Sequence, residues 1–171
     1  MACYVLMGVS GCGKSSVGAE LSKRCGVQSI DGDDLHPPSN IEKMSSGLPL
    51  NDADRGPWLV MVGQALAHAS GPIVIGCSAL RKKYRDTIRA QLSDPVHFLH
   101  LSATQEVLAT RVAGRAGHFM PKTLLDSQFA ALEPLQPDEL GCEIDIARPI
   151  SEVFSETERY VLRTMTPDNA G

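Results

Sequence analysis

The sequence predicts an α/β protein built on a parallel sheet, because two hydrophobic patterns alternate along the chain. Short apolar runs rich in β-branched residues are separated by longer amphipathic stretches. The runs are continuously apolar, which is typical of strands buried on both faces of a parallel sheet. With 171 residues, 43% hydrophobic and 21% charged, the chain is long enough to bury one core, so residues 1–171 are predicted to form a single domain.

The positions of the expected strands and helices follow from these two patterns. Strands are predicted at residues 3–7, 27–30, 72–76, 96–101 and 143–146. Helices are predicted at residues 14–25, 57–69, 82–92, 104–112, 122–132 and 151–165. Two turn-rich segments fit neither pattern, residues 35–55 and 114–121. Irregular segments on a rigid scaffold usually cover a site, so we interpret both as functional inserts.

Charge and cysteine content narrow the class of function. A formal net charge of -4 disfavours nucleic-acid binding, which usually needs a basic surface. No apolar run approaches the roughly 20 residues that cross a bilayer, and the first residues lack the features of a cleaved leader. The 5 cysteines show no metal-ligand spacing. We therefore expect a cytoplasmic protein with free thiols and neither a membrane nor a nucleic acid as partner.

A glycine-rich segment between the first predicted strand and helix matches the phosphate-binding pattern G-x-x-x-x-G-K-[ST]. Glycines let successive backbone N–H groups point at one phosphate, and the first turn of the helix adds partial positive charge. Lys14 is expected to bridge the β- and γ-phosphates of ATP, and Ser15 to bind Mg²⁺. The expected nucleotide-binding residues here are Gly8, Val9, Ser10, Gly11, Cys12, Gly13, Lys14, Ser15 and Ser16.

A dinucleotide-binding turn is the main alternative for this segment. Gly11 and Gly13 precede a helix, and Asp31 lies near the end of the second strand, as that motif requires. However, Ser16 takes the place of the third glycine, and Lys14 would crowd a pyrophosphate that backbone groups alone hold. The pattern therefore favours a phosphate-binding loop over a dinucleotide-binding turn.

Acidic residues follow the second predicted strand. Strand alternation would place Asp31 and Asp33 on the same side, next to the phosphate loop. We assign Asp31 to Mg²⁺ and Asp33 to the acceptor hydroxyl of a substrate, where it either removes a proton or only orients the hydroxyl. An acidic turn that caps the following helix is the alternative, and Asp34 fits that role better.

Taken together, the motifs resemble those of the gluconate kinases, a branch of the P-loop kinases related to shikimate kinase. Beyond the phosphate loop, the resemblance runs nearly from end to end of the chain. It rests on Asp31-Gly32-Asp33, Leu35-His36-Pro37, Asn40 to Met44, Pro49 to Asp52, Asp54-Arg55, Pro57-Trp58-Leu59, Cys77 to Leu80, Tyr84-Arg85-Asp86, Gly117-His118-Phe119, Gln128-Phe129 and Asp145-Ile146. Cys12 departs from the pattern, because serine is usual there in that family.

The resemblance implies ATP-dependent phosphorylation of D-gluconate at its 6-hydroxyl, with Mg²⁺ as cofactor. It also implies a P-loop kinase fold, with a five-stranded parallel sheet in the order 2-3-1-4-5 and helices on both faces. A mobile lid at about residues 114–121 and a homodimer are further implications.

Gluconate has a carboxylate at one end and hydroxyls along its length, so its pocket needs a cationic clamp and polar partners. Arg55 and Arg85 are the candidates for the clamp, because a guanidinium group donates two parallel hydrogen bonds to a carboxylate. For Arg85, a solvated helix charge is the alternative. The expected hydroxyl partners are His36, Ser78 and Gln128.

Three cationic or titratable residues bracket the predicted lid. Arg115 is expected to be catalytic, because a guanidinium group can meet the charge that develops on a transferred phosphoryl group. Arg111 is expected to bind the nucleotide by packing on the adenine, with a solvated helix end as the alternative. His118 is expected on the substrate side of the lid.

Two other functions stay open at this point. The first is a kinase for another small polyol acid, such as shikimate or an epimer of gluconate. The second is a nucleotide-dependent switch with no small-molecule substrate. The polar, pocket-like composition of residues 35–55 argues against a switch, which has no need of such a segment.

Overall fold

The strands of the protein form one parallel sheet in the computed structural model, which describes residues 1–114 and 122–165. Within these ranges the strands are β1 (Cys3–Met7), β2 (Gln28–Asp31), β3 (Ile73–Gly76), β4 (Val96–Ser102) and β5 (Leu140–Asp145). Their order is β2-β3-β1-β4-β5, as predicted, and all neighbouring pairs are parallel. The carboxyl ends of the strands therefore meet at one edge, where open α/β sheets bind ligands.

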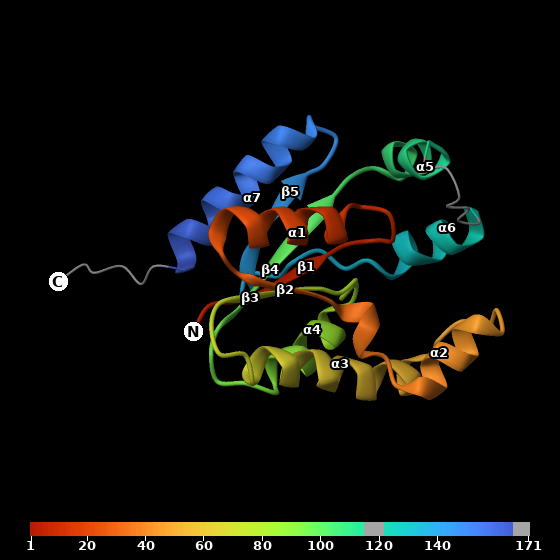
Figure 1. The fold of residues 1–171 in the computed structure, drawn as a ribbon. Coiled ribbons are helices and arrows are strands. Elements are labelled where there is room, and N and C mark those ends of the chain that lie inside the picture. Colours follow the sequence, from red (N-terminus) through yellow and green to blue (C-terminus); the bar gives the residue numbers. More distant parts are fainter. Residues whose placement is uncertain (115–121, 166–171) are drawn as a thin grey trace.

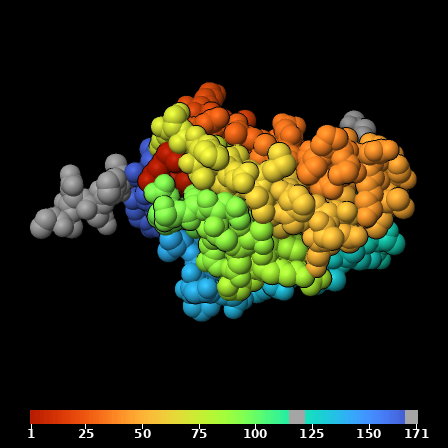
Figure 2. Space-filling view, turned by 90° about the horizontal axis from the view of Figure 1, so that it is seen from below, coloured from red at the N-terminus to blue at the C-terminus, as the bar shows by residue number. Residues whose placement is uncertain are grey.

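Helices cover both faces of this sheet (Figure 1). α1 (Lys14–Cys25) and α7 (Ile150–Met165) pack on one face. α3 (Asp52–Ala67) and α4 (Lys82–Arg89) pack on the other, and Figure 2 views the molecule from their side. α2 (Pro38–Ser45), α5 (Gln105–Ala113) and α6 (Lys122–Ala131) lie toward the end of the molecule where the strands carry their carboxyl ends.

The core consists of two layers that the sheet separates. Successive residues of β1 point to opposite faces, so Tyr4 and Leu6 join one layer while Val5 and Met7 join the other. All five β1 residues are buried, which explains why the strand is apolar without alternation. The central strand is thus fixed from both sides, and the loop that follows it starts from a rigid base.

The segment at residues 35–55, expected to be irregular, contains a helix of its own. α2 begins after Pro37, with Pro38 at its first position, which suits a helix start because proline has no N–H to satisfy. α3 begins at Asp52 rather than at the predicted residue 57. Asn51 and Asp54 form a reciprocal capping box there, with both hydrogen bonds at 2.9 Å, and this fixes the earlier start.

None of the helices within the described ranges is both long and apolar enough to span a membrane.

Candidate functional site

The phosphate loop joins β1 to α1 at the carboxyl edge of the sheet. Gly8 has a φ of 143°, in the region that favours glycine, and a side chain there would meet Cys12 Sγ and the Leu101 carbonyl oxygen, each at 2.8 Å. Its N–H donates to the Ser78 carbonyl oxygen at 3.1 Å, which ties the loop to the chain that follows β3. The loop is thus curled tightly and anchored where the motif predicts it.

Lys14 stands at the first position of α1 and turns back over this loop. Its Nζ donates to the carbonyl oxygens of Gly8, at 3.0 Å, and Val9, at 3.2 Å. Both partners are backbone groups of the loop itself, so the ammonium charge is held next to the N-terminus of α1. A positive charge and the helix N-terminus together make this point attractive to a phosphate.

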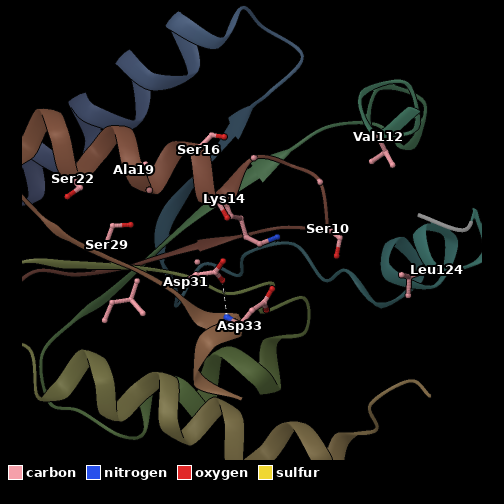
Figure 3. A pocket seen from close by; sticks show the side chains of 16 residues that line it. Ser10, Lys14, Ser16, Ala19, Ser22, Ser29, Asp31, Asp33, Val112 and Leu124 are labelled. Carbon is pink, nitrogen blue, oxygen red and sulfur yellow. Dashed lines mark hydrogen bonds between the residues drawn. The ribbon is translucent and has the colours of Figure 1, made fainter. Parts of the chain in front are cut away.

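A pocket of about 790 Å³ opens over the phosphate loop (Figure 3). Asp31 and Asp33 lie across from Lys14 in this view, and Ser15 also lines the pocket. The other lining residues are Ser10, Gly11, Gly13, Ser16, Gly18, Ala19, Ser22, Ser29, Ile30, Gly76, Val112 and Leu124. The structure therefore brings both predicted carboxylates into one cavity with most of the predicted nucleotide-binding residues, although Gly8, Val9 and Cys12 do not line it.

Asp31 and Asp33 reach this pocket by a route other than strand alternation. β2 ends at Asp31, and Gly32–Leu35 forms a 3₁₀ turn, η1, in which Asp33 N–H donates to Asp31 Oδ1 at 3.0 Å. The expectation that alternation aligns them was wrong, because the chain leaves the strand at Gly32. A Cβ at Gly32 would lie 2.2 Å from the Gly76 carbonyl oxygen, so only glycine permits this close turn.

The two carboxylates differ in exposure and environment. The Asp33 side chain is 82% exposed and projects into the pocket. Although this side chain is exposed, the nearby pocket walls reduce its solvation, and this desolvation and the charge of Asp31 raise the pKa of Asp33, while His36 and Lys14 act in the opposite direction. A carboxylate with a raised pKa accepts a proton more readily, which fits the role predicted for Asp33.

His36 lies behind Asp33 rather than in the pocket wall. Its side chain is only 5% exposed, and its Nε2 is 4.0 Å from Asp33 Oδ1. The imidazole stacks on Trp58, with ring centroids 4.1 Å apart, and burial lowers the pKa of His36. The structure thus places His36 behind the carboxylate, and its role as a direct hydroxyl partner stays a prediction.

Arg85 is buried, which contradicts both of its predicted roles, the substrate clamp and the solvated helix charge. Its side chain is 0% exposed and forms a two-pronged ion pair with Glu139, at 2.7 and 3.0 Å. The remaining N–H groups donate to the carbonyl oxygens of Ala79, Leu80 and Pro134. Because all five donors have partners inside the protein, Arg85 holds the chain after β3 against the segment before β5.

Arg55 remains accessible, although it does not line the main pocket. It is half-buried near the start of α3, with its guanidinium 5.6 Å from the centre of the Tyr84 ring. It also lies 3.4 Å from Asp52, whose carboxylate accepts hydrogen bonds from Lys83 and Tyr84. These hydrogen bonds lower the pKa of Asp52 to about 2.

Gln128 and Ser78 contact the phosphate loop. Gln128 of α6 accepts from the Ser10 N–H at 2.7 Å and donates to the Ser10 hydroxyl at 3.0 Å. Both ends of its amide thereby contact the loop, and its role as a hydroxyl partner of the substrate stays a prediction. Ser78 contributes its carbonyl oxygen to Gly8, and its side chain is half-buried.

The lid residues divide between described and undescribed parts of the chain. Arg111 of α5 donates to the carbonyl oxygen of Ile146, just beyond β5, so it is not a solvated helix end. Its neighbour Val112 lines the pocket above the phosphate loop. The predictions for Arg115 and His118, and for most of the lid, lie outside the described residues.

Sequence reasoning left two buried polar residues without a role. Asn40 of α2 lies four residues after His36 in the chain, and its amide nitrogen is 3.3 Å from His36 Nδ1. Glu139 is the partner of Arg85 and lies 54 residues further along the chain. His36 is extended and precedes α2, so the first pair has no helical spacing that could have indicated it. The second pair depends on the tertiary fold and has no local signal.

Comparison with known proteins places this site in a family. A family model described as an AAA domain matches residues 4–135. The thermosensitive gluconokinase of Escherichia coli strain K12 is 46% identical, covering 93% of this chain and 87% of the relative. A probable gluconokinase of Xenopus tropicalis is 42% identical and covers 94% of each chain.

Solved structures agree with these relatives. The crystal structure of a gluconokinase from Sinorhizobium meliloti 1021 superposes with a TM-score of 0.88 at 43% identity, covering 96% of this chain and 93% of that one. The range that the family model matches includes the phosphate loop, the carboxylates beside it and residues 35–55. The chain therefore belongs to the gluconokinase family of P-loop kinases.

Proposed function

We propose that the protein transfers the γ-phosphoryl group of ATP to the 6-hydroxyl of D-gluconate, giving 6-phospho-D-gluconate and ADP. The observation that carries this proposal is one pocket that Lys14, Ser15, Asp31 and Asp33 all line. A phosphate-binding loop and a carboxylate that can orient the acceptor hydroxyl are the two parts that transfer to an alcohol uses. The gluconokinase relatives identify the alcohol.

The residues of this chain divide the work of the reaction. Lys14 and the loop N–H groups bind the phosphates and offset the charge that develops during transfer. Asp33 accepts a hydrogen bond, and finally the proton, from the 6-hydroxyl, which holds the attacking oxygen in line. Arg111 stays on the nucleotide side, and we assign Arg115 to the transferred phosphoryl group and His118 to the substrate side.

The donor set beside the loop fits a magnesium ion. Ser15 offers a hydroxyl and Asp31 a carboxylate, and both line the same pocket. Oxygen donors of this kind suit Mg²⁺, which usually keeps several waters and binds through one or two protein groups plus substrate phosphates. When bound, Mg²⁺ would neutralise phosphate charge, while Ser15 and Asp31 would hold it.

Arg55 is our candidate for the gluconate carboxylate. The buried ion pair of Arg85 excludes it from this role. The Arg55 guanidinium is only half-buried and lies at the end of the segment 35–55. Packing against Tyr84 limits its freedom, so that less conformational entropy is lost when it binds an anion. We assign the Ser78 hydroxyl to the middle of the substrate.

We also propose that the protein acts in the cytoplasm as a homodimer. All five cysteines are free thiols, which fits a reducing compartment. Sedimentation at micromolar concentration tests the assembly, and a single species with the mass of one chain would contradict the homodimer.

The test of the function is ADP release with Mg²⁺ and ATP, measured with and without D-gluconate. Shikimate and L-idonate serve as controls of similar size and charge. Strong stimulation by D-gluconate alone is expected. Stimulation by another acid alone would keep the kinase and change the substrate, whereas no stimulation by any acid would favour a nucleotide-dependent switch.

A further inference from the structure

His36 has a hydrogen-bond arrangement that fixes which ring nitrogen carries its proton. The Asn40 amide nitrogen donates to the Asp54 carbonyl oxygen at 2.9 Å. A backbone carbonyl only accepts hydrogen bonds, so this contact sets the orientation of the Asn40 amide. The same amide nitrogen lies 3.3 Å from His36 Nδ1. An NH₂ group has two hydrogens, and the second can point only at an unprotonated Nδ1.

The surroundings keep this arrangement rigid. Asn40 is 3% exposed, and His36 is stacked on Trp58, whose Nε1 donates to the Gly32 carbonyl oxygen at 2.8 Å. Asp54 lies in the first turn of α3 and is held by Lys43 at 2.6 Å. Asp54, Asn40 and the His36 imidazole therefore each have a neighbour that limits their rotation.

We propose that Asn40 is a positioning residue, which keeps His36 in the neutral tautomer with its proton on Nε2, so that the imidazole is a fixed hydrogen-bond donor behind Asp33. The Nε2 lies 4.0 Å from Asp33 Oδ1, which is too long for a hydrogen bond. The Asp33 side chain is exposed, however, and a small rotation brings its oxygen within reach. The imidazole can then hold one carboxylate oxygen while the other faces the substrate hydroxyl.

The role assigned to Asp33 rests on the proposed function, but the tautomer does not. The first measurement is therefore spectroscopic: long-range ¹⁵N–¹H correlation spectra of the histidine rings at a pH where His36 is neutral. The His36 signals are assigned by their loss in His36→Gln. We expect a protonated Nε2 and an unprotonated Nδ1. A proton on Nδ1, or a mixture of the two tautomers, would overturn the proposal. This result needs only the wild-type spectrum and no substitution of Asn40.

The variant Asn40→Asp tests whether Asn40 sets the tautomer of His36. A carboxylate at this position accepts from Nδ1–H, so the His36 proton should move to Nδ1 or the ring should become cationic. Ser39→Asp is the matched control, because it adds the same charge one residue earlier on the exposed side of α2. The control should leave the His36 spectrum unchanged. An unaltered His36 spectrum in folded Asn40→Asp would contradict the proposal.

A double-mutant cycle separates positioning from a structural role. If Asn40 acts through the imidazole, Asn40→Asp lowers kcat with gluconate about tenfold in the His36 protein but less than about twofold in the His36→Gln protein. An equal loss in both backgrounds would show that Asn40 acts on the fold alone. If gluconate stimulates no turnover while the spectra are as expected, the proposed function fails and the tautomer assignment stands.

Discussion

At the scale of single residues, the position of Lys14 predicts what removal of its charge does to the reaction. Its Nζ is held by two carbonyl oxygens of the phosphate loop, so its charge is already in place for a phosphate. We expect Lys14→Ala to lower kcat by about 10²–10³-fold, as removal of one preorganised donor does elsewhere. Lys23→Ala, in the last turn of the same helix, is the control in the steady-state assay. Near-normal turnover in Lys14→Ala would undo the phosphate-loop assignment.

Replacement of Asp33 should change kcat rather than ATP affinity, because its carboxylate acts on the acceptor hydroxyl. Replacing Asp33 by Asn keeps its size but removes the proton acceptor, so kcat should fall by about 10²–10⁴-fold while ATP affinity stays nearly constant. Asp34→Asn, in the same 3₁₀ turn, provides the matched control. Parallel titration of ATP binding separates the two effects. If ATP binding were lost and kcat kept, Asp33 would belong to the nucleotide site instead.

Residue roles were only partly predictable from the sequence. Lys14 and Asp33 belong to local motifs, and a motif carries its own geometry wherever the strand and helix around it form. Arg85 was wrongly predicted as a substrate clamp, with a solvated charge as the alternative, because its carboxylate partner comes from a distant segment. The burial of His36 could not be predicted, because the sequence shows its neighbours along the chain but not the Trp58 ring that covers it.

At the scale of elements, the Arg85–Glu139 pair joins α4 to the segment before β5. Burial raises the pKa of Glu139, but the hydrogen bonds from Arg85 and the Gln136 N–H, together with the charges of Arg85 and Arg89, hold that pKa below its usual value. Glu139→Gln leaves the buried guanidinium without a counter-charge, so the free energy of unfolding should fall by roughly 3–5 kcal/mol. Urea denaturation measures it.

The neighbouring Asp138 supplies the control for that experiment. It forms an exposed ion pair with Lys82 at 3.3 Å, and exposed pairs contribute only about 0–1 kcal/mol. Asp138→Asn should therefore change the urea midpoint little. Equal shifts in the two variants would mean that the buried pair contributes no more than a surface pair.

The contact between α3 and α4 predicts a specific acid sensitivity. Lys83 and Tyr84 lower the pKa of Asp52 to about 2 in the folded protein, below its ordinary value. A depressed carboxylate pKa stabilises the fold above the unfolded value, and this contribution is lost as pH falls through the folded value. The wild type should thus lose more stability than Asp52→Asn between pH of about 4 and 2. Parallel curves for the two proteins in that range would contradict the contact.

The bounds of some elements could be predicted closely, whereas those of others could not. β1 is apolar at every position because both of its faces are covered, so its bounds were predicted to the residue. α2 has Asn40 as its only buried residue and therefore no apolar stripe from which a helix could be recognised. β5 begins at the exposed Leu140, three residues before the predicted strand, because an edge strand need not be apolar along its whole length.

At the scale of the whole molecule, the pocket joins parts of the chain that are distant in sequence. β1 and α1 supply the phosphate loop, the end of β2 supplies the carboxylates, and α5 and α6 close the opposite side. The order of the strands could be expected from the family resemblance. The contact of α6 with the loop could not, because it depends on how a helix packs across the edge of the sheet.

That contact distinguishes two roles for Gln128. Its amide engages both the N–H and the hydroxyl of Ser10, so Gln128→Ala should loosen the loop and weaken ATP binding. Ligand stabilisation follows RT ln(1 + [L]/Kd), so the rise in Tm on adding ATP should be smaller in the variant at equal ATP concentration. The KM for gluconate should change by less than about twofold, since the amide contacts the loop.

Ser127→Ala, on the exposed side of the same helix, should behave as wild type. A raised KM for gluconate with unchanged stabilisation by ATP would support the substrate role predicted from the sequence. It would also show that the contact with Ser10 breaks when gluconate binds.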